Sequence, residues 1–242
     1  MVCAKKSTQH FIITEMLRFL RVNTVNKEWS EQNKTMQGSL KKKETFSSGI
    51  ETLFQLRKEL MQQMTLFKNE LSVQDFSAMP YPNAKGYHNK TIAYSLWHIF
   101  RIEDIAAHTL IADDEQVFFK NDHQRRIGSP IITTGNELCG KEISEFSEML
   151  SVAALYDYIC EVYHSTEDLL KKLSFEDMKT KVSAPKRDAL EALKVVSSDE
   201  NANWLIEYWC TKDIRGLIQM PFSRHWIMHT EACLRIRDKL IK

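Results

Sequence analysis

Three of the eight histidines fall on apolar helix faces, at positions where leucine or isoleucine is expected. His225 and His229 are four residues apart, which places both on the same face of a helix with Cα atoms about 6 Å apart. Both imidazoles can therefore reach one metal ion, and His98 can reach it from a second helix. Burying an imidazole costs apolar contact and demands partners for its nitrogens, a cost that a metal ion offsets. The pattern indicates a candidate site for a divalent metal.

The same spacing also fits an ordinary structural explanation. His98 can be a hydrogen-bonded core histidine, with His225 and His229 partly exposed at a helix start. Cys233 is predicted to be a core residue, because it lies about 12 Å along the helix from His225, too far for its short thiol to share the ion. The remaining histidines of the central part of the chain are predicted to lie at the surface or rim: His88, His108, His123 and His164.

The elements that must position these histidines are long helices. The 242 residues include only 7 glycines and 5 prolines, which is too few for the many turns of a β-sandwich or barrel. Apolar residues recur at steps of three and four between the clusters of these helix breakers. The sequence predicts an all-α fold, a four-helix bundle, with helices over 46–71, 91–112, 147–174 and 222–240.

The chain divides into two predicted regions. Residues 1–45 are expected to hold an amphipathic helix within 1–22 and a polar, lysine-rich linker over 23–45. Residues 46–242 are expected to form the four-helix bundle.

Charge and cysteine content exclude several classes of protein. The 33 Lys and Arg residues nearly balance the 32 Asp and Glu residues, and a net charge of +1 argues against a nucleic-acid partner. No segment is apolar enough to span a membrane, so no membrane partner is expected. Five cysteines without a Cys-x-x-Cys pair fit reduced thiols. We expect a soluble cytoplasmic protein.

Charged and aromatic residues near the three histidines suggest a substrate environment. Arg101 or Arg224 could steer an anionic substrate, although both also fit solvated flanking charges. No carboxylate falls on an apolar helix face, so the sequence identifies no general base. Four aromatic residues would line a pocket if the helix ends splay apart, and would otherwise pack as core: Tyr94, Trp97, Trp209 and Trp226.

Two segments, 95–104 (SLWHIFRIED) and 221–232 (PFSRHWIMHTEA), resemble the DinB-like (DinB/YfiT-type, damage-inducible) family of metalloenzymes. The resemblance covers roughly residues 46–242. It implies a four-helix bundle in which His98, His225 and His229 bind a divalent ion such as Zn²⁺ or Ni²⁺, with water in the open coordination positions. Three protein ligands with open positions are typical of catalytic metal sites.

The resemblance also implies a class of activity. Some members of the family are thiol-dependent S-transferases or isomerases that use low-molecular-weight thiols. We therefore expect a metal-dependent transferase or hydrolase that acts on a small molecule, with a low-molecular-weight thiol as a candidate partner. The alternative is a non-catalytic metal-binding or structural helical protein. The outer helix faces could also pair two copies in a homodimer.

Overall fold

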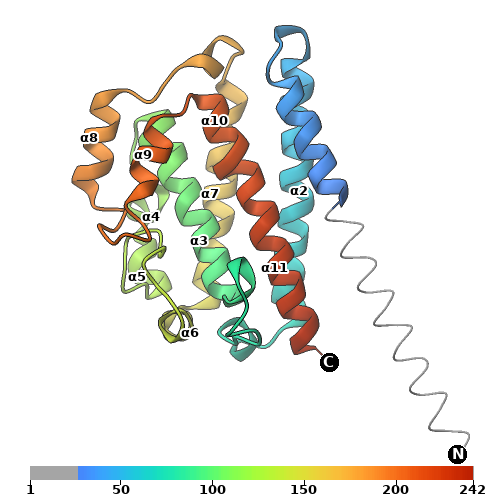
Figure 1. Cartoon of the computed structure of the whole chain (residues 1–242), viewed down its shortest axis with the longest axis vertical. Helices are drawn as coiled ribbons and strands as arrows, with labels where there is room; N and C mark the ends of the chain where they lie inside the picture. The colour runs from blue at the N-terminus through green and yellow to red at the C-terminus, as the bar shows by residue number, and fades with distance from the viewer. Residues whose placement is uncertain (1–26, 242) are drawn as a thin grey trace, which may run out of the picture.

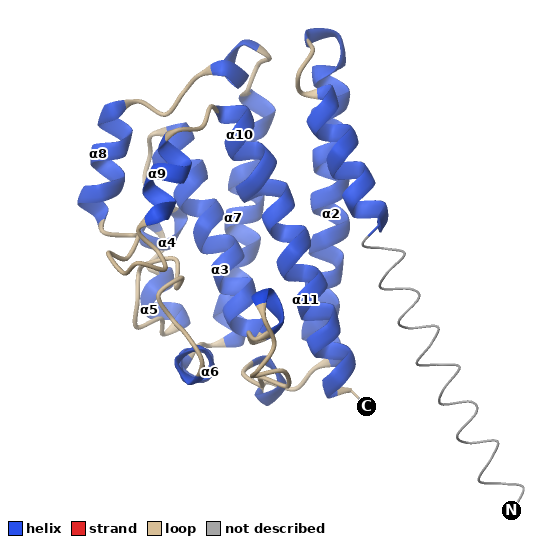
Figure 2. Cartoon of the chain, in the orientation of Figure 1, coloured by secondary structure: helices blue, strands red, loops and turns tan. Residues whose placement is uncertain are grey.

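The computed structural model describes residues 27–241, and all of its regular elements in that range are helices (Figures 1 and 2). The closest approach to a strand within 27–241 is an isolated antiparallel bridge between Lys181 and Asp213. The predicted all-α class is therefore confirmed for the described residues. The amphipathic helix predicted within 1–22 lies outside them.

Four long helical segments run side by side in Figure 1. Three of them are single α-helices: α2 (Phe46–Glu70), α7 (Val152–Lys172) and α11 (His225–Leu240). The fourth is α3 (Ile92–Asp104), which continues directly into the π-helix η4 (Ile105–Ala112). All four lie within a few residues of the helices predicted from the spacing of apolar residues.

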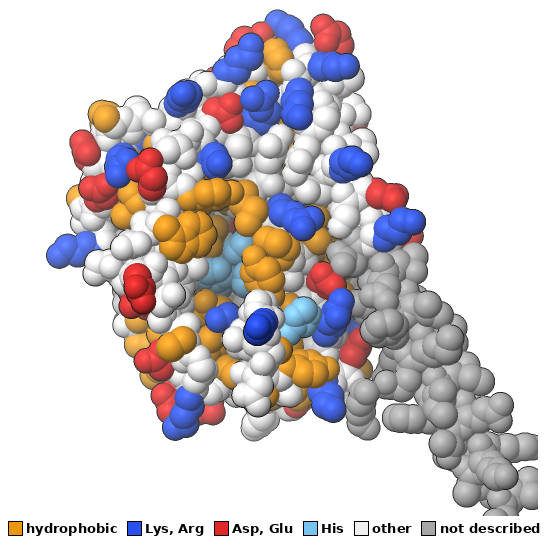
Figure 3. Space-filling view, in the orientation of Figure 1, with side chains coloured by type: hydrophobic (Ala, Val, Ile, Leu, Met, Phe, Trp, Pro, Cys, Tyr) orange, Lys and Arg blue, Asp and Glu red, His pale blue; other side chains and the backbone are white. Residues whose placement is uncertain are grey.

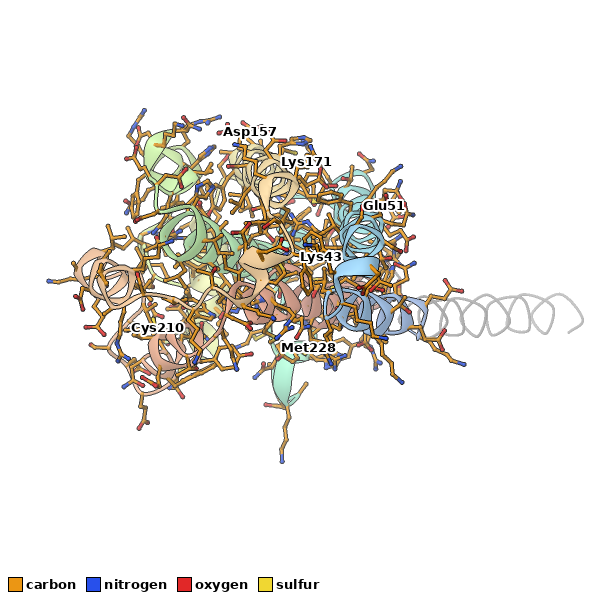
Figure 4. The ribbon with its side chains drawn as sticks, turned by 90° about the horizontal axis from the view of Figure 1, so that it is seen from above. Lys43, Glu51, Asp157, Lys171, Cys210 and Met228 are labelled. Atoms are coloured by element: carbon orange, nitrogen blue, oxygen red, sulfur yellow. The ribbon has the colours of Figure 1, made fainter. Side chains whose placement is uncertain are left out.

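Shorter helices connect these four segments. Those between α2 and α3 are η2 (Gln74–Phe76) and η3 (Gly86–His88), and η1 (Lys43–Thr45) precedes α2. Between η4 and α7 the chain forms α4 (Val117–Lys120), α5 (His123–Ile127) and α6 (Lys141–Met149). Between α7 and α11 it forms η5 (Glu176–Lys179), α8 (Ala184–Leu193), α9 (Trp204–Cys210), α10 (Ile214–Gln219) and the π-helix η6 (Met220–Arg224). Seen from above, Cys210 at the end of α9 and Glu51 on α2 lie on opposite sides of the molecule (Figure 4). No described helix is both long enough and apolar enough to cross a membrane.

Residues 27–39 form a helix, so the polar linker predicted for 23–45 is wrong over this stretch. Trp29, Met36 and Leu40 are spaced by seven and four residues, share one face and are buried. Gly49 of α2 permits the close approach, because a Cβ added there would lie 3.0 Å from the Leu40 side chain. The prediction failed because three apolar residues among many charged ones looked too sparse to form a buried face.

Helix α3 lies at the centre of the fold. Every residue from Ile92 to Asp104 is buried, because α6, α7 and α11 all pack against α3. The prediction of one apolar face is therefore wrong for α3. Three charged side chains, Arg101, Glu103 and Asp104, are buried with it, so α3 brings two carboxylates into the interior although neither lies on the apolar face predicted from the sequence.

Glu103 forms an ion pair that joins three helices. The guanidinium of Arg57 on α2 donates to both carboxylate oxygens of Glu103 at 2.8 Å, and both side chains are fully buried. Arg57 also donates to the carbonyl of Phe222 at 3.3 Å and lies 4.4 Å from the ring centroid of Trp226. The pair thus links α2, α3 and the start of α11, and its bidentate geometry satisfies both charges.

Arg101 and Asp104 hold the segment that follows η4. Arg101 donates to the side-chain oxygen of Gln116 at 2.6 Å and to the carbonyl of Ile132 at 3.0 Å. Asp104 accepts hydrogen bonds from the backbone amides of Val117 and Phe118 at 2.8 and 2.9 Å. These contacts fix the connection between η4 and α7 against the central helix.

Removing one partner of the Arg57–Glu103 pair should be far more damaging than removing both. We expect Glu103→Ala to lower the free energy of unfolding by about 3–5 kcal/mol, because it leaves a buried guanidinium without a counter-charge. The double change Arg57→Met/Glu103→Leu should lie closer to wild type. Urea denaturation measures both, with Arg187→Ala as the control, because that change breaks ion pairs that are only half-buried. If Glu103→Ala lowered the free energy of unfolding no more than Arg187→Ala, the stabilising role of the Arg57–Glu103 pair would be contradicted.

Candidate metal centre

The three histidines on apolar faces converge in space. His98 lies in the middle of α3, and His225 and His229 lie in the first two turns of α11. Each histidine contributes one ring nitrogen, and these three nitrogens lie within 4.8 Å of one another. The ring centroids are 4.6–5.0 Å apart, and all three side chains are buried. A single metal ion can therefore be reached by all three imidazoles.

The π-helix η6 sets where α11 begins. Pro221 cannot donate a backbone hydrogen bond, and the wider π turn places His225 at the first residue of α11. The hydroxyl of Ser223 donates to the carbonyl of Ile218 at 3.0 Å, and the Phe222 carbonyl accepts from Arg57. The turn that presents His225 is thus tied to α10 and to the buried ion pair.

His98 is oriented by a loop between α5 and α6. Its Nδ1 donates to the carbonyl of Thr134 at 2.6 Å, which leaves Nε2 free to bind a metal. The ring stacks on Tyr94 with centroids 5.4 Å apart, and the Tyr94 hydroxyl donates to the carbonyl of Gly135 at 2.9 Å. Such a hydrogen bond on the far nitrogen is the usual way that a protein fixes a metal-binding imidazole.

Several nitrogens of the other two histidines have no partner within the described structure. Nδ1 of His225 and both ring nitrogens of His229 are buried without a hydrogen bond. A buried polar atom that lacks a partner costs about 1–3 kcal/mol. A metal ion would supply a partner, so the residues present fit a metal better than they fit the hydrogen-bonded alternative left open by the sequence.

The protonation state also suits a metal. Burial lowers the pKa of His98 to about 4, although the Thr134 carbonyl raises it and the positive charge of Lys90 lowers it. Burial also holds the pKa values of His225 and His229 well below the ordinary value, and neighbouring imidazoles lower them further. At neutral pH all three imidazoles are neutral, which is the form that binds metal.

The three histidines form one wall of a cavity of about 230 Å³. Figure 3 shows histidine side chains at the floor of a hollow surrounded by hydrophobic side chains. The remaining lining is mainly aromatic and apolar: Tyr87, Ile102, Asn136, Trp204, Leu205, Tyr208, Trp209, Met220 and Pro221. A ligand of the metal could therefore enter from this side.

The structure places most of the other residues considered for the site away from the three histidines. Arg101 is buried and committed to Gln116 and Ile132, so its predicted role in steering a substrate is wrong. Arg224 is exposed and does not line the cavity. Cys233 is buried in the core, as predicted. Of the four aromatic residues, only Trp209 lines the cavity, whereas Tyr94 stacks on His98 and Trp97 and Trp226 pack in the core.

Two histidines predicted to lie at the surface or rim are buried instead. His108 donates or accepts on both nitrogens, 2.5 Å from a carboxylate oxygen of Asp114 and 2.9 Å from the hydroxyl of Ser165. His123 lies 3.0 Å from the carboxylate of Glu161. Both histidines connect the segment after α3 to α7, which explains why burial is tolerated there.

The sequence did not reveal the residues that complete the site. Thr134 and Asn136 lie in a loop, where apolar periodicity carries no information. Trp204 and Tyr208 share one face of α9 through their i, i+4 spacing, a signal that could have been noticed but does not point to the histidines by itself.

No protein-family model matches the chain, and no curated protein matches it in sequence.

Gly135 is expected to control the affinity for metal. Its φ is +75°, and an added Cβ would lie 2.9 Å from the Trp97 ring and 3.1 Å from Tyr94. Gly135→Ala should therefore displace the Thr134 carbonyl from His98 and weaken zinc binding about tenfold. Gly86→Ala is a matched control, since Gly86 has φ +73° and open space around its Cβ position. Chelator competition measures both affinities, and equal effects would argue against the role of Thr134.

The metal-free protein should lose stability as the pH falls from about 6.5 to about 4. The folded-state pKa of His98 is about 4, below the 6.5 of an unperturbed histidine, and those of His225 and His229 are lowered in the same direction. The unfolded state therefore takes up protons first, so the stability is complete above pH 6.5 and declines below it. Urea midpoints across this range measure the effect. The variant His98→Asn/His229→Asn should show a shallower decline, and an equal slope would contradict the prediction.

Proposed function

We propose that this chain is a metal-dependent enzyme of the DinB-like type, in which His98, His225 and His229 bind one divalent ion next to a substrate cavity. The observation that carries the proposal is the convergence of three neutral, buried imidazoles, two of which, His225 and His229, have buried ring nitrogens without a hydrogen-bond partner. The cavity beside them is open to a small molecule and lined mainly by apolar groups.

The arrangement of helices supports the family proposal. The four long segments fit a four-helix bundle of DinB/YfiT type, with one histidine on the second long helix and two on the fourth. The resemblance of segments 95–104 and 221–232 to that family implies the same three residues as metal ligands, which supports the proposal.

Zinc or nickel bound by three imidazoles would supply Lewis acidity and an open position for a thiolate or a water molecule. The residues of the chain prepare that position. Thr134 fixes the orientation of His98, while Trp209 and Leu205 limit the access of water. The buried carboxylates of α3 are engaged elsewhere, since Glu103 pairs with Arg57 and Asp104 binds backbone amides. We therefore assign no general base, and we propose transfer of a low-molecular-weight thiol to a small electrophile as the reaction class.

A structural role for the metal is the second candidate. It is favoured by one observation, that the ligands come from two different helices, α3 and α11, which an ion would hold together. The Arg57–Glu103 pair already joins α3 to the turn before α11 through the Phe222 carbonyl, so the fold does not need an ion for this link. The cavity beside the histidines is not explained by a structural role, and it favours the enzyme.

Elemental analysis of the purified protein tests the site. Wild type should carry close to one divalent ion per chain after reconstitution, and His225→Ala/His229→Ala should carry none, because a single imidazole cannot retain the ion. His164→Ala, which removes an exposed histidine of α7, is the matched control and should bind metal like wild type.

A thiol-transfer assay with 1-chloro-2,4-dinitrobenzene then separates the two candidates. The enzyme predicts activity that chelator abolishes and zinc or nickel restores. If activity stays at background while His98→Ala lowers the melting temperature as much as chelator does, the metal is structural. Wild type without metal after reconstitution would refute both.

A further inference from the structure

The cavity beside the three histidines has one aromatic wall, supplied by a single short helix. Trp204, Leu205, Tyr208 and Trp209 of α9 all line it. The rings of Trp204 and Tyr208 lie edge to face with centroids 5.8 Å apart. The indole of Trp204 is 49% exposed, yet its nitrogen donates to the Asn201 carbonyl at 2.9 Å, which fixes its orientation. A half-exposed indole held at the rim of a cavity offers a flat surface for an aromatic ligand.

A single amide also lines this cavity. The side-chain oxygen of Asn136 accepts a hydrogen bond from the Thr134 hydroxyl at 2.7 Å. This leaves the two amide hydrogens of Asn136 to donate to a ligand. Thr134 also holds His98 through its carbonyl, so one fully buried residue positions both the metal ligand and the amide. The donor is therefore built into the site at a fixed place beside the histidines.

The charges around the cavity favour an anion. None of the residues that line it is acidic, and three neutral imidazoles leave the double charge of a divalent ion uncompensated. The half-buried Lys90 adds positive potential, since its ammonium lies 5.3 Å from the ring centroid of Tyr94, which stacks on His98. Lys212 lies 4.5 Å from the ring centroid of Tyr208. A negatively charged ligand would thus be attracted both to the ion and to the entrance.

We propose that the cavity binds a small aromatic carboxylate, with its carboxylate group directed to the metal and to the amide of Asn136, and its ring against Trp204 and Tyr208. The inference rests on the proposed metal site and names the ligand class that the site takes. A cavity of about 230 Å³ is larger than the roughly 150 Å³ of an apolar cavity that holds benzene, which suits a ligand with one ring.

Titration of the zinc-loaded full chain by ¹⁹F NMR tests the ligand class. The probe is 4-fluorobenzoate, fluoroacetate lacks the ring, and 4-fluorobenzamide lacks the charge. We expect 4-fluorobenzoate to bind at least tenfold more tightly than either control compound, because only this probe uses both the aromatic wall and the charge. The zinc content of every sample is measured alongside.

Variants at the cavity test the individual residues. Asn136→Asp keeps the shape and the bond from Thr134 but places a negative charge beside the ligand, and it should weaken 4-fluorobenzoate binding about tenfold or more without reducing the zinc content. Trp204→Ala should weaken binding about fivefold. Leu193→Ala, at an exposed position on α8, should bind like wild type.

The outcomes distinguish this inference from the proposed function. Zinc-loaded protein that binds the three compounds equally, or an Asn136→Asp variant that binds 4-fluorobenzoate like wild type, overturns the inference and leaves the metal site intact. Loss of zinc from Asn136→Asp shows that Asn136 serves the metal, which also overturns its role toward the ligand. Wild type that takes up no zinc overturns the proposed function and this inference together.

Discussion

The structure depends on the complete burial of one helix that carries charged groups. Helix α3 carries charged and imidazole groups but is buried over its whole length, so each of those groups needs a partner from another segment. Glu103 forms an ion pair with Arg57 of α2, Asp104 accepts hydrogen bonds from backbone amides of α4, and His98 donates to the Thr134 carbonyl. Because these partners come from distant parts of the sequence, satisfying α3 fixes the positions of the elements around it.

The metal centre follows from the same constraint. Nδ1 of His225 and both ring nitrogens of His229 are among the buried polar atoms without a partner in the described structure, and the Thr134 carbonyl occupies only Nδ1 of His98. Burial lowers the pKa values of the three histidines, so they stay neutral at neutral pH. Protonation therefore does not offset the cost of burying their nitrogens. A divalent ion between the three imidazoles would bind one nitrogen of each, and the adjoining cavity would leave the open side of that ion to a ligand. The stability of the fold and the proposed metal site thus depend on the same buried nitrogens.

The sequence was most informative where histidines interrupt the regular spacing of apolar residues along a helix. Apolar spacing located the four long helices to within a few residues, and the histidines that interrupt it are the ones that converge. Apolar spacing gave wrong predictions where contacts between distant segments determine which residues are buried. Arg101 looked like a solvated flank charge because nothing local reveals that α3 is surrounded, and Trp29, Met36 and Leu40 looked too sparse to build a helix. Thr134, Asn136 and Trp204 escaped notice because loops and a seven-residue helix have no period long enough to interpret.

A crystal structure of the zinc-reconstituted protein, with anomalous data collected at the zinc absorption edge, would show whether the three histidines bind one ion. We expect a single anomalous peak at about 2.0–2.1 Å from one nitrogen of each of His98, His225 and His229. The His98 nitrogen that contacts the ion should be Nε2, with Nδ1 still bonded to Thr134. An absence of density between these three side chains, or a zinc ion bound instead at the His108 and Asp114 cluster, would contradict this prediction.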